Sequence, residues 1–125
     1  MARSLHILSV GYDRFLMRVR SLVLRSSGYS VEEVYSGEQA VLRAESDTID
    51  LLLICHTIPE RDQKKLIAAV QRRRRLLPIL CINNREFTFP LSGCVGVENT
   101  PVELLEGVQA AVLVTRRGLL KRLGA

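Results

Sequence analysis

The sequence predicts a doubly wound α/β domain, in which helices cover both faces of a five-stranded parallel sheet. Short apolar runs alternate along the chain with segments of helical apolar spacing, and the connections between the runs are too long for hairpins. The run Leu51-Leu52-Leu53-Ile54-Cys55 is apolar at every position, which is typical of a strand buried on both faces of a parallel sheet.

The strands are expected where an apolar or β-rich run meets a break in the pattern. The first run stops at Gly11, the fourth begins after Pro78, and the fifth is the weakest of the five. The expected ranges are 5–10, 30–34, 50–55, 79–82 and 94–97.

The helices are expected from apolar spacing and from capping residues. In the first helix, Phe15, Val19, Leu22 and Val23 recur at helical spacing, and Gly28 ends it because glycine takes a positive φ at little cost. The other helices are expected after the capping box Ser36-Gly37-Glu38-Gln39, over 62–75, and after the N-terminal signal Thr100-Pro101-Val102-Glu103.

Length and charge narrow the class of protein. The 125 residues suit one domain, with 1–115 as its body and 116–125 as a basic extension of the last helix. The net charge of +5 comes from two basic clusters, at 72–75 and 116–122, and the remaining chain is net acidic, so a uniformly basic nucleic-acid binder is not favoured. No apolar run is long enough to span a membrane. Three widely spaced cysteines indicate a reducing compartment, and we expect a cytoplasmic protein.

Turn and capping residues between the elements also follow a specific order and spacing. They are Gly28-Tyr29-Ser30-Val31, Ser36-Gly37-Glu38-Gln39-Ala40, Asp50, Pro59, Pro78, Gly93 and Thr100-Pro101. With this framework, nearly the whole chain resembles the response regulator receiver domains, the CheY-like members of the flavodoxin-like class. The resemblance implies strand order 2-1-3-4-5, five flanking helices, and a functional crevice at the carboxyl ends of the strands.

The chain departs from receivers where they carry their chemistry. Receivers have a metal-binding acidic pair, a phosphate-accepting aspartate, a hydroxyl residue, an aromatic switch residue and a lysine. The resemblance places at these positions, in the same order, Gly11 and Tyr12, Cys55, Asn83, Val97 and Thr100.

These replacements predict a lost active site. Mg²⁺ prefers carboxylate oxygens, which Gly11 and Tyr12 do not have, and phosphoryl transfer needs that metal and a cation to neutralise developing charge. We therefore expect no Mg²⁺ or other metal, no cofactor, no enzymatic activity and no phosphorylation of Cys55. Asp13, one residue further along, is better interpreted as the N-cap of the first helix.

Three segments are candidate partner surfaces. The first is the basic cluster at 72–75, which ends the third helix. The second is the segment 84–92, which is too short and too rich in β-favouring residues for the helix that receivers have there. Helix four is therefore predicted to be short or absent. The third is the extension at 116–125, which has apolar residues at helical spacing. The residues concerned are Arg72, Arg73, Arg74, Arg75, Phe87, Phe89, Leu119 and Leu123.

The function predicted from the sequence is that of a stand-alone, degenerate receiver-like protein in two-component (phosphorelay) signalling. It would bind a signalling partner independently of phosphorylation, and it could form a homodimer. Two alternatives remain open: a thiol or redox sensor centred on Cys55, and nucleic-acid binding through the basic clusters. The sequence also leaves open whether the crevice binds a small molecule.

Overall fold

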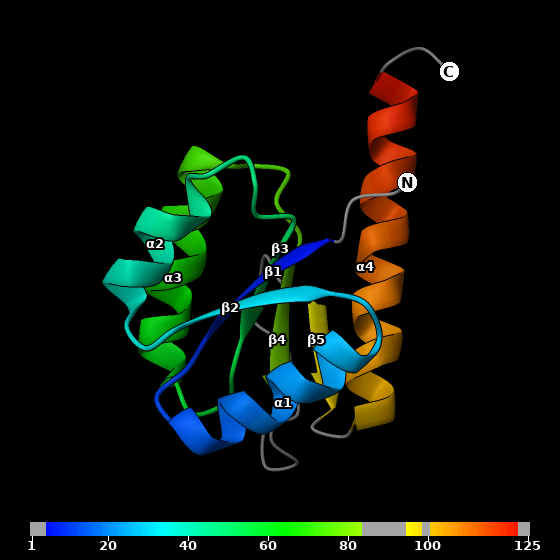
Figure 1. The fold of residues 1–125 in the computed structure, drawn as a ribbon. Helices are drawn as coiled ribbons and strands as arrows, with labels where there is room; N and C mark the ends of the chain where they lie inside the picture. Colours follow the sequence, from blue (N-terminus) through cyan, green and yellow to red (C-terminus); the bar gives the residue numbers. More distant parts are fainter. Residues whose placement is uncertain (1–4, 84–94, 99–100, 123–125) are drawn as a thin grey trace.

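The predicted fold class is confirmed. The computed structural model describes residues 5–83, 95–98 and 101–122, with side chains for 5–82, 101–111 and 113. The strands form one parallel sheet in the order β2-β1-β3-β4-β5 (Figure 1). The elements are β1 (His6–Val10), α1 (Arg14–Ser26), β2 (Ser30–Val34), α2 (Gly37–Ala44), β3 (Leu51–Ile54), α3 (Glu60–Arg73), β4 (Ile79–Asn83), β5 (Val95–Glu98) and α4 (Pro101–Arg122). The segment 84–92, in which a short or absent helix was predicted, lies outside the described residues.

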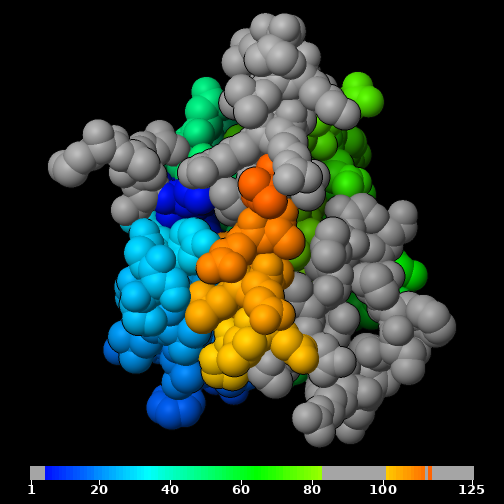
Figure 2. All heavy atoms as spheres, turned by 90° about the vertical axis from the view of Figure 1, so that its right-hand side faces the viewer, coloured from blue at the N-terminus to red at the C-terminus, as the bar shows by residue number. Residues whose placement is uncertain are grey.

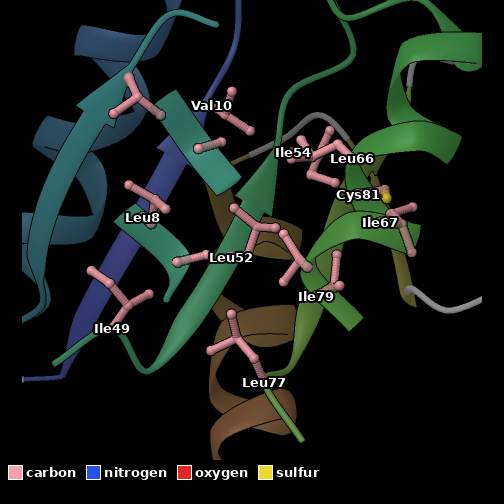
Figure 3. Packing of buried hydrophobic residues seen from close by; sticks show 14 of the residues in the cluster. Leu8, Val10, Ile49, Leu52, Ile54, Leu66, Ile67, Leu77, Ile79 and Cys81 are labelled. Atoms are coloured by element: carbon pink, nitrogen blue, oxygen red, sulfur yellow. The ribbon is translucent and has the colours of Figure 1, made fainter. Parts of the chain in front are cut away.

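The sheet is covered on both faces, as its continuous apolar strands require. Figure 1 shows α2 and α3 on one face and α1 and α4 on the other. Because alternate strand residues point to opposite faces, β3 contributes Leu52 and Ile54 to the α2/α3 layer and Leu51 and Leu53 to the α1/α4 layer. Figure 3 shows the first of these layers, where strand side chains meet Leu66 and Ile67 from α3.

The ends of the elements follow local signals, with small shifts from the predicted bounds. The Ser36 side chain accepts a hydrogen bond from the Gln39 backbone N–H at 3.2 Å, so it caps α2 as predicted. Gly28 has φ +94° directly after α1, the conformation that favours glycine. Helix α3 begins two residues before the predicted 62, because Pro59 already serves as its N-cap.

Helix α1 forms as predicted but turns a different face to the core. Its buried residues are Met17, Arg20, Ser21 and Leu24, whereas the apolar residues Phe15, Val19 and Leu22 are exposed. Positions 17, 20, 21 and 24 are also helically spaced, so the 3.6-residue period fits either face. The sequence pattern identified the helix correctly but could not identify its buried side.

Candidate functional site

The loops after β1 and β3 meet at the carboxyl ends of the strands. The Gly11 N–H donates to the Val34 carbonyl at 3.3 Å, and the Cys55 N–H donates to the Val10 carbonyl at 2.9 Å, so both loops leave the sheet still hydrogen-bonded to it. The Tyr12 N–H then donates to Thr57 Oγ1 at 3.0 Å. The parallel topology therefore brings Cys55 together with Gly11 and Tyr12, from which it is separated by more than forty residues in the chain.

The side chain of Cys55 points into the core and leaves no room beside it. It is 0 % exposed and belongs to the α1/α4 layer, with Sγ 3.9 Å from Ser9 Oγ. A Cβ atom added at Gly11 would lie 2.8 Å from the Cys55 Cβ, 3.2 Å from its Sγ and 3.0 Å from the Met17 Sδ. Side-chain atoms of Cys55 and Met17 thus block the space into which a side chain at position 11 would begin.

Burial also governs the chemistry of the Cys55 thiol. Removal from water raises the pKa of Cys55, and this effect outweighs the opposing influence of the nearby Arg20 cation and of the Ser9 hydroxyl. A thiol of this kind is protonated at neutral pH, whereas a reactive sensor cysteine needs an accessible thiolate. The structure gives no support to the thiol-sensor alternative.

Arg20 is a component of this site that sequence reasoning missed. It comes from the buried face of α1, is 6 % exposed, and places Nη2 3.0 Å from His56 Nδ1. Because a guanidinium only donates, His56 Nδ1 accepts and the neutral ring carries its proton on Nε2. The helical spacing of positions 17, 20, 21 and 24 could have indicated that Arg20 lies on the buried side of α1. The residues at 15, 19 and 22 on the other side are more apolar, so the sequence pattern favoured that side.

Because of the Arg20–His56 contact, we expect the free energy of unfolding to depend on pH. Burial and the Arg20 charge hold the pKa of His56 below its ordinary value of 6.5. The unfolded chain then binds a proton more readily than the folded one, so this contribution to stability is lost as pH falls through about 6.5 and below. We expect the free energy of unfolding, measured by urea denaturation, to decrease from pH 7.5 to pH 5.5.

A His56→Gln variant should flatten that dependence, since glutamine can accept from Arg20 but does not titrate in this range. His6→Gln replaces the other histidine of the chain and is the matched control for the change of residue type. Equal slopes in wild type and His56→Gln would show that the contact does not govern the pH response.

The residues at this site do not suit a receiver's Mg²⁺ ion. Position 11 has no carboxylate and no space for one beside Cys55, and Tyr12 supplies a phenol in place of a carboxylate. Asp13 Oδ1 accepts the Leu16 N–H at 3.0 Å and caps α1, as predicted. Within the described ranges, no group of three His, Cys, Asp or Glu side chains could hold a metal ion.

Comparison with solved structures decides the fold family. The receiver domain of the hybrid histidine kinase CckA superimposes with a TM-score of 0.71 at 27% sequence identity, covering 86% of this chain and 98% of that one. This chain has the fold of the response regulator receiver domains. A putative response regulator from Chloroflexus aurantiacus J-10-fl is similar at 24% identity and TM-score 0.75, covering 89% of this chain and 99% of that one.

A further receiver structure, the CheY-like domain from Methanospirillum hungatei JF-1, has a TM-score of 0.77 at 16% identity, with 93% of this chain and 99% of that one covered. No protein-family model matches the sequence, and no curated protein matches it. The resemblance predicted from the sequence is therefore confirmed at the level of the receiver fold.

The structure describes the backbone positions of only some of the remaining predicted site residues. Asn83 is the last residue of β4, and the backbone of Val97 pairs with Ile82, as expected for the switch position on the fifth strand. The side chains of these two positions and of Leu119 lie outside the described part, as do the whole residues Thr100, Phe87, Phe89 and Leu123. None of the helices in the described part is both long and apolar enough to cross a membrane.

The basic cluster at the end of α3, which was predicted as a partner surface, contains arginines with different contacts. Arg73 pairs with Glu45, and Arg74 Nη1 donates to three backbone carbonyls at the end of α2 and in the loop after it. Arg72 and Arg75 are exposed, as is Arg73. Half of the cluster therefore holds α2 and α3 together, which weakens the nucleic-acid alternative.

Proposed function

We propose that this chain is a receiver-fold interaction module of two-component signalling that works without phosphorylation and without catalysis of its own. The observation that carries the proposal is the packing of Cys55 against Gly11, because it removes both the phosphate acceptor and the space for a metal-binding carboxylate. The fold that receivers use to contact signalling partners is retained. The partner is accordingly a protein of that signalling system, met in the cytoplasm.

The chemistry of the described site supports this proposal. A phosphoryl acceptor must be reachable by the donor, and the Cys55 thiol is fully buried with a raised pKa. Arg20 brings one positive charge near the thiol, but this side chain is buried and its Nη2 is hydrogen-bonded to His56 Nδ1. One buried cation does not replace a metal ion that bridges the acceptor and the transferred phosphoryl group.

The proposal is tested by incubating the purified chain with acetyl phosphate and Mg²⁺ and recording its intact mass. We expect no added phosphoryl group under conditions that fully label a conventional receiver treated in parallel. A Cys55→Ser variant identifies the acceptor if an adduct forms. A stoichiometric adduct that disappears in Cys55→Ser would contradict the proposal.

A further inference from the structure

Strand β2 forms an edge of the sheet, because among the described strands it pairs only with β1. Figure 2 shows this part of the chain, in light blue and cyan, at one border of the molecule. The Ser30 N–H is hydrogen-bonded at 2.9 Å to the residue before β1, and the Val34 carbonyl at 3.3 Å to the residue after it. The backbone groups of successive strand residues point to opposite sides, so Val31 and Glu33 direct their N–H and C=O groups away from β1.

Two side chains from neighbouring helices occupy backbone groups of this outer edge. Arg25 Nη2, in the last turn of α1, donates to the Val31 carbonyl at 3.0 Å. Gln39 Oε1, in the first turn of α2, accepts from the N–H of Tyr35, the residue after β2, at 3.3 Å. Both contacts agree with the outward direction of positions 31 and 35. They cap the edge on either side of Glu33.

The two capped groups would be hydrogen-bond partners of each other in a symmetric dimer. If β2 paired antiparallel with β2 of a second copy about Glu33, Val31 would lie opposite Tyr35 of that copy, because both positions are two residues from 33. In such a ladder the Val31 carbonyl accepts from the Tyr35 N–H of the second copy. Arg25 and Gln39 hold these same two groups in the structure.

The residue at the centre of this pairing also opposes it. Glu33 would lie opposite Glu33 of the second copy, and like charges directly opposite each other destabilise a strand pair. Glu33 Oε1 accepts from the Tyr35 hydroxyl at 3.2 Å, so the carboxylate is held beside the edge. A charged side chain on an edge strand hinders association through that edge.

We infer that the outer edge of β2 is a pairing surface for a second copy of the chain, and that Arg25, Gln39 and Glu33 keep it closed. A second copy is the occupant because the two capped groups match each other across a two-fold axis. The inference concerns self-association and does not depend on the proposed signalling function, so the acetyl phosphate experiment leaves it unaffected.

Sedimentation velocity of the full chain over a range of concentrations tests this inference. Arg25→Ala/Gln39→Ala/Glu33→Gln removes both caps and the opposed charges. This variant should dimerise with a Kd at least tenfold below that of wild type. The matched control is Arg18→Ala/Gln109→Ala/Glu106→Gln, which makes the same three changes at exposed residues of α1 and α4 and should sediment like wild type.

A proline at position 33 identifies the edge as the site of pairing. Replacing Glu33→Gln by Glu33→Pro in the triple variant should restore the monomer, because proline has no N–H to offer a second copy. The N–H of residue 33 points away from β1, so the substitution removes no hydrogen bond of the sheet. As a second measurement that needs no proline, amide hydrogen exchange of Glu33 in the dimer at position 33 as Gln should be at least tenfold slower than in the monomer.

Several outcomes would overturn the inference. They are a triple variant that stays as monomeric as wild type, an equal gain of dimer in the control, a dimer that persists with Glu33→Pro, or exchange at position 33 that dimerisation does not slow. Dimerisation of the variant through another surface would be recognised by the last two results.

Discussion

A Gly11→Ala variant should lose roughly 2–3 kcal/mol of stability, although it gains only one methyl group. The added Cβ would lie 2.8 Å from the Cys55 Cβ, closer than real Cβ atoms approach, and 3.0 Å from the Met17 Sδ, which is an unusually tight contact. Neither neighbour can move easily, because Cys55 and Met17 are both fully buried. Urea denaturation followed by circular dichroism measures the loss.

A matched substitution separates this clash from the general effect of removing a glycine. Gly37 begins α2, and a Cβ added there meets nothing within 4 Å, so Gly37→Ala should be neutral or stabilise by about 0.5 kcal/mol. Adding Cys55→Gly to Gly11→Ala should recover part of the loss, since it removes the nearest atom. If Gly11→Ala unfolds at the wild-type urea concentration, the close packing of the two positions is wrong.

The packing at Gly11 also bears on whether a receiver's metal site could be restored. Gly11→Asp alone would place its Cβ in the same occupied space, so the carboxylate could not be introduced without loss of stability. Packing around position 11 therefore disfavours a carboxylate there, in addition to the residue types at the strand ends. A carboxylate at position 11 would also require a smaller residue at position 55.

An Arg74→Met variant should lose about 2 kcal/mol, because hydrogen bonds from a charged donor are among the stronger ones and these are partly buried. Arg74 Nη1 donates to the carbonyls of Ile49 at 2.6 Å, Ser46 at 2.8 Å and, more weakly, Ala44 at 3.4 Å. Ala44 ends α2, so its carbonyl has no partner within the helix. We expect Tm to fall by roughly 8 °C, measured by differential scanning calorimetry.

The neighbouring arginines provide controls with the same change of charge. Arg72→Met and Arg75→Met alter exposed side chains, so each should shift the stability by no more than about 0.5 kcal/mol. If all three variants have the same Tm, Arg74 does not join α2 to α3 as described. The same set also shows which substitutions can test nucleic-acid binding without damaging the fold: Arg72 and Arg75 qualify, and Arg74 does not.

The α1 helix shows how much a pattern of spacing can determine. The sequence predicted its existence, its Asp13 cap and its end at Gly28, because these depend on residues within a few positions of one another. It could not determine which stripe faces the sheet. The buried side depends on the shape and chemistry of the surfaces against which α1 packs. Here the stripe that contains Arg20 packs against the sheet, and Phe15 and Leu22 remain exposed.

The sequence by itself determined the parallel fold, its strand order through the receiver resemblance, and the absence of acidic residues from the ends of β1 and β3. These follow from local periodicity and from residue identity. Only the tertiary structure decided that Cys55 points into the core, that Arg20 reaches His56, and that Arg74 joins two helices. Each of these contacts joins residues more than twenty positions apart, and their geometry exists only once the sheet has brought the separate segments together.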